Sequence, residues 1–250
     1  MALLEVRDLR VSFTTPDGQV DAVSGLDYDL EPGETLGLVG GSGSGKTQSA
    51  LALLGLLAEN GSATGSVRFR GQELLGLSTS ELSRIRGSKI SMIFQDPVSS
   101  LNPYMTIGDQ LIEVLTHHRN LKRREARQRA EEMLSKVRFI DPESRMRQYP
   151  HELSGGMCQR VMIAMGLLCQ PDLLIADEPT TALDVTVQSQ INIMMKELSE
   201  QFSTAILLIT HDLGVVAGMC DRVLVMRGGQ EVELSEVHAL FAQPQHEYTQ

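Results

Sequence analysis

The chain has 250 residues, of which 42% are hydrophobic and 22% charged, and this composition excludes a disordered or fibrous protein. Its 32 acidic and 22 basic residues give a formal charge of −10, which argues against non-specific nucleic-acid binding as its main role. Apolar stretches such as residues 161–168 fall far short of the roughly 20 residues that a membrane span needs. No signal-like segment opens the sequence, and the three cysteines are not clustered. We therefore expect a soluble intracellular globular protein.

The first 95 residues predict mainly strands. Apolar residues alternate near the start, and a compact apolar run that stops at glycines follows, as in a buried parallel strand. Apolar spacing then changes to that of a helix. The expected order is strands at 4–13, 20–26 and 34–39, a helix at 45–57, a strand pair at 65–74 and a strand at 89–95.

The remaining chain predicts two amphipathic helices and then a return to strand–helix alternation. The expected elements are helices at 107–117 and 123–137, a helix at 156–168, a strand at 172–176, a helix at 186–201, a strand at 205–210, and a last strand at 222–226 after a short helix. Such alternation predicts an α/β fold with a mainly parallel sheet covered on both faces. The helical middle is interpreted as an insertion into this core.

Residues 40–47, GGSGSGKT, match the phosphate-loop pattern G-x-x-x-x-G-K-[ST]. Glycines let backbone N–H groups turn toward phosphate oxygens, and the following helix offers its positive N-terminal end. Lys46 would reach the β- and γ-phosphates, and the Thr47 hydroxyl would reach Mg²⁺. A flexible Gly/Ser turn is the alternative, but it would not require the strand before it and the helix after it.

An apolar strand at residues 173–176 runs directly into two carboxylates, Asp177 and Glu178. Beside the phosphate-loop strand, Asp177 would reach the Mg²⁺ shell and Glu178 the attacking water. The alternative is a turn or helix start, where acidic side chains are commonly just solvated. The phosphate loop favours the first interpretation.

Residues 153–157, LSGGM, begin another apolar helix and could present backbone N–H groups to a second phosphate. An ordinary serine N-cap is the alternative. Because the chain already has one phosphate loop, a second phosphate-facing helix end suggests a γ-phosphate held between two subunits.

Taken in order, GGSGSGKT, LSGGM, LLIADEP (173–179), TALD (181–184) and ITHD (209–212) make the sequence resemble the ATP-binding subunits of ATP-binding cassette (ABC) transporters, over essentially the whole chain. The resemblance implies a single nucleotide-binding domain over 1–250 with a P-loop NTPase core. It further implies that the RecA-like core, with an N-terminal antiparallel β subdomain, occupies about 1–95 and 160–250. An α-helical subdomain is expected at about 97–159.

The resemblance also implies the ligands, ATP and Mg²⁺, and a role for each site residue. Lys46, Gln95, Glu178 and His211 would be catalytic, and Thr47, Gln95 and Asp177 would serve the metal. The nucleotide-binding set would be Phe13, which stacks on adenine, with Gly40, Gly41, Ser42, Gly43, Ser44, Gly45, Lys46, Thr47 and Gln48, and, across a dimer, Ser154, Gly155, Gly156, Met157 and Asp184.

Without the resemblance, several of these residues have ordinary structural explanations. Phe13 could be a core residue of an edge strand, Gln95 a surface strand end, His211 a loop histidine and Asp184 a helix N-cap. The cysteines fit no metal spacing, and Cys158 and Cys169 are interpreted as small core residues.

Other stretches are similar to the oligopeptide/dipeptide/nickel importer group: SMIFQDP (91–97), SLNPYM (100–105), TTALDVTVQ (180–188) and PQHEYT (244–249). Within it, residues 55–61 and 100–105 are most similar to the D-type ATPase of oligopeptide transporters. Gly41 stands where the group usually has glutamate, and Cys158 where arginine is usual. Family members continue into a cysteine-containing tail, so the sequence is expected to be truncated or a short homologue.

The expected function is ATP hydrolysis that powers import of oligopeptides or dipeptides by ATP-driven dimer closure; nickel or another small solute is the alternative cargo. A non-transport ATPase acting on nucleic acid is less favoured because of the acidic charge and the lack of a coiled-coil or zinc insertion. A non-hydrolysing regulator would be expected to lack Glu178 or His211, and this sequence has both.

The expected partners are a second ATPase that is related but distinct, and two membrane permease subunits that contact the region from Gln95 to Ile107. A solute-binding protein is expected to act indirectly, and no nucleic acid is expected. The expected location is peripheral, on the cytoplasmic face of the inner membrane.

Overall fold

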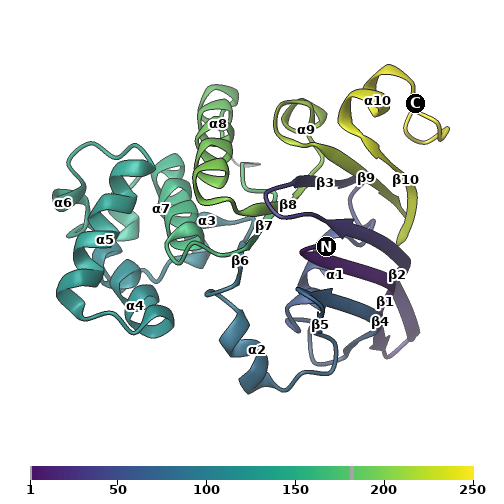
Figure 1. Cartoon of the computed structure of the whole chain (residues 1–250), viewed down its shortest axis with the longest axis horizontal. Helices are drawn as coiled ribbons and strands as arrows, with labels where there is room; N and C mark the ends of the chain where they lie inside the picture. Colours follow the sequence, from purple (N-terminus) through teal and green to yellow (C-terminus); the bar gives the residue numbers. More distant parts are fainter. Residues whose placement is uncertain (1, 181–182) are drawn as a thin grey trace. The chain divides into compact units, whose positions relative to one another are not determined.

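The computed structural model describes residues 2–180 and 183–250 of the chain. The chain folds into two compact units, the first formed by Met1–Ser83 and Ala205–Gln250 and the second by Arg84–Thr204. Figure 1 shows the elements of each unit. The predicted boundaries of a helical subdomain stay a prediction. No helix within the described residues combines the length and the apolar composition that crossing a membrane requires.

The first unit contains an antiparallel sheet with strand order β2-β1-β4-β5. Its strands are β1 (Leu4–Thr15), β2 (Gly18–Leu30), β4 (Gly61–Phe69) and β5 (Gln72–Glu73). The apolar residues whose alternation predicted β1 occupy most of its buried positions. The expected strand pair near residue 65 is confirmed but begins earlier, at Gly61, because β4 continues its pairing with β1 up to Phe13.

The first unit also contains a strand group in the order β10-β9-β3-β8. Its strands are β3 (Thr35–Gly40), β8 (Ala205–Thr210), β9 (Arg222–Arg227) and β10 (Gln230–Glu236), with α9 (Leu213–Met219) and α10 (Val237–Ala242) alongside. β3 pairs in parallel with both β8 and β9, as expected of buried apolar strands.

The expectation that β9 is the last strand is wrong, because β10 follows it and pairs antiparallel. Gly228 and Gly229 both have positive φ and form the tight turn between them. β10 carries three glutamates in seven residues, so its composition obscured a strand.

Helix α1 (Lys46–Leu53) follows β3 in the first unit and is shorter than predicted. The apolar spacing extended the predicted helix to residue 57, but Gly55 takes a left-handed conformation with φ +59° just after the helix. A left-handed glycine at this place ends a helix, since it cannot continue the right-handed turn.

In the second unit, β6 (Ile90–Ile93) and β7 (Leu173–Asp177) pair in parallel. The helices include α4 (Ile107–Arg119), α5 (Arg123–Lys136), α6 (Pro142–Arg145), α7 (Gly155–Leu167) and α8 (Val185–Phe202), with short turns at α3 (Pro97–Ser100) and η1 (Pro150–Glu152). Gly166 lets α7 lie close to both strands, because a Cβ there would come within 3.2 Å of Ile93 and Leu174. A further helix that the sequence did not predict, α2 (Thr79–Ile85), begins in the first unit and crosses the boundary between the units.

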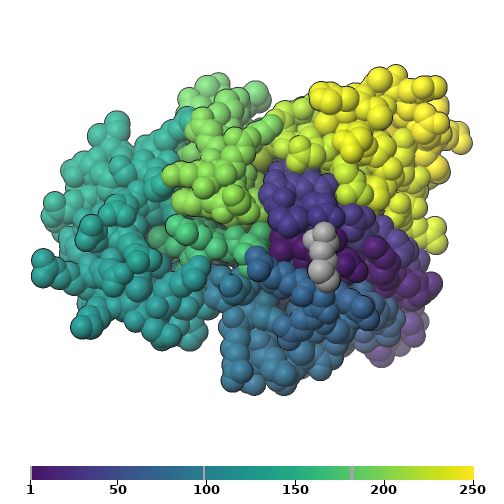
Figure 2. All heavy atoms as spheres, in the orientation of Figure 1, coloured from purple at the N-terminus to yellow at the C-terminus, as the bar shows by residue number. Residues whose placement is uncertain are grey.

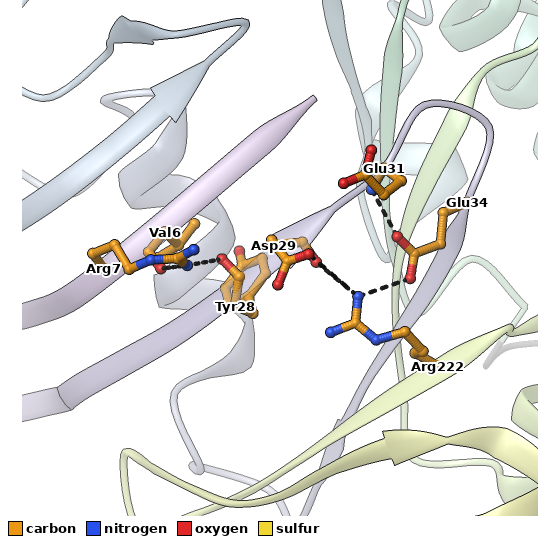
Figure 3. Close-up of polar contacts among 7 residues, drawn as sticks. All are labelled: Val6, Arg7, Tyr28, Asp29, Glu31, Glu34 and Arg222. Carbon is orange, nitrogen blue, oxygen red and sulfur yellow. Dashed lines mark hydrogen bonds and ion pairs between the residues drawn. The ribbon is translucent and has the colours of Figure 1, made fainter. Parts of the chain in front are cut away.

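Arg222, at the start of β9, joins three segments of the first unit (Figure 3). Its guanidinium donates to the carboxylate of Glu34 at 3.1 Å and to the carbonyl of Asp29 at 3.4 Å, and it lies 3.6 Å from the Asp29 carboxylate. Burial by itself lowers the pKa of Arg222, but the two carboxylates outweigh it and raise that pKa. The side chains of Arg222 and Glu34 are 22% and 11% exposed, so this pair is screened less than a surface pair.

We expect Arg222→Met to lower the free energy of unfolding by about 1–3 kcal/mol, because it leaves Glu34 partly buried without its cation. Urea unfolding of the two proteins measures the change. Arg10→Met is the matched control: Arg10 pairs with Asp8 on the exposed surface, where solvent screens the pair, so its loss should lower the free energy of unfolding far less. Equal effects of the two substitutions would contradict this account.

Candidate active site

The phosphate loop connects β3 to α1 in the first unit, as predicted. Gly40 and Gly45 both have positive φ. A Cβ at Gly40 would collide with the carbonyl oxygen of Met226, and one at Gly45 with that of Ala22. Neither position can therefore carry a side chain, and the loop keeps the tight path that turns backbone groups inward.

Lys46, the first residue of α1, is 7% exposed and lies within the loop that it follows. Its Nζ donates to the carbonyl of Gly40 at 2.8 Å and to that of Gly41 at 2.9 Å. The loop therefore curls around a buried ammonium group at the positive end of a helix, which is the environment that an anionic phosphate chain requires. The next residue, Thr47, is exposed.

Phe13 lies on β1, half-buried, opposite Gly61 of β4. A Cβ on Gly61 would approach the Phe13 ring to 2.7 Å, so the ring lies over this glycine. One part of the ring is packed and another is accessible. Both the core interpretation and the adenine-stacking interpretation fit this position, and the stacking stays a prediction.

His211 follows β8 in the first unit and is exposed. It lines a cavity of about 510 Å³ together with Gly40, Gly41 and Tyr248. Since β8 is the parallel neighbour of β3, the ends of the two strands bring His211 to the start of the phosphate loop. The prediction of a histidine near the phosphate loop therefore has a geometric basis within this unit.

Gln95 and Glu178 meet in the second unit. Ile93 of β6 is in register with Ala176 of β7, and each of the two side chains comes two residues later. The Gln95 Nε2 donates to Glu178 Oε2 at 3.0 Å. Glu178 has a left-handed backbone, φ +46°, which is uncommon for a non-glycine residue and often marks a functional position. Asp177, the last residue of β7, is buried.

The signature segment, residues 153–157, begins α7. Ser154 is the N-cap and accepts from the Met157 N–H at 3.4 Å, while Gly155 is exposed. Asp184 caps α8 by accepting from the N–H groups of Thr186 and Val187, so its interpretation as an N-cap is confirmed. Its role across a dimer stays a prediction. Thr181 and Ala182 of the TALD motif lie outside the described residues.

The start of α7 and the start of α8 are close neighbours in the second unit. A Cβ on Gly156 would lie 3.0 Å from Val187, and one on Gly155 would lie 4.0 Å from Leu183. The two glycines thus allow both helix N-termini to sit at one place. This arrangement could present backbone N–H groups to an anion supplied by another molecule.

The residues assigned to Mg²⁺ offer a hydroxyl, a carboxylate and an amide, from Thr47, Asp177 and Gln95. Oxygen donors of this kind are the ones that Mg²⁺ prefers, and the buried carboxylate of Asp177 fits a cationic neighbour. Among the described residues no group of three or more His, Cys, Asp and Glu side chains could hold a metal by itself. These oxygen donors are of the kind that Mg²⁺ binds, and the assignment of the metal to Thr47, Asp177 and Gln95 stays a prediction.

The three cysteines lie in the interior of the protein. Cys158, Cys169 and Cys220 are not joined in disulfides, and all three are buried. Burial raises the pKa of the Cys158 and Cys169 thiols, which makes both less reactive. Their interpretation as small core residues is confirmed.

Tyr248 is the residue near the phosphate loop that the sequence did not assign to the site. Its hydroxyl accepts from the Gly41 N–H at 3.2 Å. The stretch 244–249 carried a family resemblance but no chemical motif, so nothing in the sequence placed it beside a loop some 200 residues earlier.

The chain is similar to known proteins in both sequence and fold. A family profile, ABC transporter, matches residues 23–181. The chain is 58% identical over 248 residues to the oligopeptide transport ATP-binding protein OppD of Escherichia coli (99% of this chain, 74% of the relative) and 49% identical over 249 residues to the dipeptide transport ATP-binding protein DppD of Bacillus subtilis (99% and 74%). A solved dimeric ATP-binding cassette in a post-hydrolysis state with ADP and Pi superposes with a TM-score of 0.84 at 26% identity, over 94% of this chain and 98% of that one. The fold is that of ABC nucleotide-binding domains. This chain belongs to the ABC transporter family, as one of its ATP-binding, ATP-hydrolysing subunits.

Proposed function

We propose that this chain hydrolyses ATP to drive the import of oligopeptides across the cytoplasmic membrane, from a peripheral position on its cytoplasmic face. The observation that carries the proposal is the Glu178 carboxylate at the end of β7, held at 3.0 Å by the amide of Gln95. A carboxylate fixed at a strand end is suited to accept a proton from water. The relatives named for oligopeptide transport favour peptides as the cargo over nickel or another small solute.

In this mechanism Glu178 orients the attacking water and takes its proton as the γ-phosphate bond breaks. Gln95 donates a hydrogen bond to Glu178 and so holds the carboxylate in its orientation toward the water. Gln95 would also sense the γ-phosphate. The left-handed backbone at Glu178 turns the chain sharply after the buried strand. That turn lets the side chain leave the sheet edge while Asp177 stays buried.

Lys46 neutralises charge on the β- and γ-phosphates, and the loop N–H groups hold the phosphate chain in place. His211 would contact the γ-phosphate, since it lines the same cavity as Gly40 and Gly41. Thr47, Asp177 and Gln95 would hold Mg²⁺, which supplies electrostatic stabilisation of the transferring phosphoryl group. Preorganised charges of this kind supply most of the rate enhancement in phosphoryl transfer.

The signature segment, residues 153–157, would act on the nucleotide of a second ATPase subunit. The Ser154 hydroxyl accepts a hydrogen bond from the Met157 N–H, and Gly155 is exposed, so the start of α7 is accessible. Two such subunits closing head to tail would bury ATP between one phosphate loop and the other signature segment. The dimeric state of the similar ATP-binding cassette supports this arrangement.

The permease subunits are proposed to dock in the second unit around Tyr104. Its side chain is 90% exposed, an unusual state for a tyrosine. It borders a cavity of about 570 Å³ that is also lined by Met105, Ile112, Glu113 and the Asp109–Arg123 ion pair, whose atoms lie 2.6 Å apart. An apolar centre flanked by polar and charged groups suits a partner helix that carries both apolar and polar residues.

The proposal is tested by purifying the chain with its neighbouring transport subunits and measuring uptake into vesicles. We expect ATP-dependent uptake of labelled oligopeptides that a Tyr104→Ala subunit supports poorly, because it docks less well. Uptake of dipeptides but not oligopeptides, or of nickel but not peptides, would show that the proposed cargo is wrong. Copurification with nucleic acid instead of membrane subunits would overturn the transport function.

A further inference from the structure

The C-terminal segment of the first unit, residues 243–250, lies against the phosphate loop. It follows α10, and its residues form part of a continuous surface at the C-terminal end of the chain (Figures 1 and 2, yellow). Pro244, Tyr248, Thr249 and Gln250 line the 510 Å³ cavity with Gly40, Gly41 and His211. The segment is therefore a wall of the space next to the phosphate loop.

Tyr248 makes the direct contact. Its hydroxyl accepts from the Gly41 N–H at 3.2 Å, and the guanidinium of Arg227 lies 4.9 Å from the centre of its ring. A Cβ on Gly41 would lie 3.3 Å from the same hydroxyl, so the lack of a side chain there lets the phenol approach closely. The ring is thus held by a cation–π contact at one side while its hydroxyl meets the loop backbone.

Glu233 of β10 holds the segment that carries Tyr248. Its two carboxylate oxygens accept from the N–H of Gln245 at 2.9 Å and from that of His246 at 3.1 Å. Burial by itself raises the pKa of Glu233, but these hydrogen bonds outweigh it and lower that pKa, so the group stays ionised near neutral pH. His246 Nδ1 in turn accepts from the Tyr248 N–H at 3.0 Å. A chain of contacts therefore runs from a buried carboxylate to the tyrosine backbone.

Gly41 is also part of the lysine cradle, since its carbonyl accepts from Lys46 Nζ at 2.9 Å. The hydrogen bond from the Gly41 N–H to Tyr248 restricts the orientation of the planar peptide group that contains this N–H. We infer that Tyr248 is a positioning residue for the phosphate loop, oriented by Glu233, and that it favours ATP binding by keeping the loop in its receptive shape. This inference rests on the proposed role of the loop in ATP binding.

The test is steady-state ATP hydrolysis by the Tyr248→Phe chain, which keeps the ring and removes only the hydroxyl. Loss of one hydrogen bond from a binding loop should raise the KM for ATP about two- to tenfold. We expect kcat to change less than twofold, since Tyr248 does not touch the reacting atoms. Tyr248→Ala, which also loses the contact with Arg227, should raise KM further.

Glu233→Gln tests the orientation of the segment, because its amide nitrogen cannot accept one of the two backbone N–H groups. We expect the KM for ATP to rise in this variant. The double variant Glu233→Gln/Tyr248→Phe should have nearly the same KM as Tyr248→Phe alone, because both substitutions act through the contact between Tyr248 and Gly41. Ser235→Ala is the matched control: it removes a hydroxyl hydrogen bond from the same strand and should leave KM unchanged.

Two outcomes separate the inference from the proposed function. If Lys46→Ala weakens ATP binding as expected but Tyr248→Phe leaves KM unchanged, the loop binds ATP and the positioning role is wrong. If the Lys46→Ala protein instead binds ATP with normal affinity, the proposed function of the loop itself fails. A fall in melting temperature for Tyr248→Phe with an unchanged KM shows a purely structural contact and likewise overturns the inference.

Discussion

Replacing Glu178 with glutamine is expected to lower ATP turnover by about a hundredfold to ten-thousandfold, the range that a general base contributes. The amide cannot take the proton of the attacking water, yet it is nearly the same size and can still meet Gln95. ATP binding should be retained, because the phosphate loop belongs to the other unit of the chain and is unaltered. ATP should therefore accumulate on the variant, and the subunits should dimerise when ATP is added.

Phosphate release with saturating ATP measures turnover, and sedimentation with and without ATP measures dimerisation. Glu200→Gln is the matched control, since it makes the same chemical change on an exposed face of α8 and should leave turnover unaltered. Normal turnover in the Glu178→Gln protein would show that another group acts as the base. Loss of ATP binding in that protein would show that Glu178 acts in binding instead.

Replacing Lys46 with alanine should weaken ATP binding by at least ten- to a hundredfold, the equivalent of a lost charge-assisted hydrogen bond of about 1.5–3 kcal/mol. Lys46 is the cation that the loop encloses, and its ammonium donates to the carbonyls of Gly40 and Gly41. Its loss removes the positive charge and also the contacts that hold the loop around it. Hydrolysis at low ATP should fall in proportion to the lost affinity.

Equilibrium binding of a fluorescent ATP analogue measures this change, and thermal unfolding reports whether the fold is intact. Lys122→Ala removes an exposed lysine at the start of α5 and should leave affinity unaltered. Undiminished affinity in the Lys46→Ala protein would remove the basis for assigning residues 40–47 to the phosphates. A folded protein with no affinity would support it.

Local patterns were sufficient for most of the elements. The phosphate loop was predicted because glycine, lysine and threonine at fixed spacing have few other uses between a strand and a helix. The strands expected at 34–39 and 205–210 were predicted from their continuous apolar residues, which are buried in β3 and β8. By contrast, β10 was missed because it is rich in glutamate, and α1 ends early because one glycine takes a left-handed conformation.

The sequence by itself determined an acidic chain of 250 residues with the residue types of an ABC ATPase, since those motifs are contiguous and depend on local spacing. Only the tertiary structure decided which distant residues meet. Gln95 reaches Glu178 because β6 and β7 are parallel neighbours in register, and Tyr248 reaches Gly41 because the segment after β10 folds back on the loop. Such contacts join residues 83 and 207 positions apart, and strand pairing and burial set them rather than any pattern along the chain.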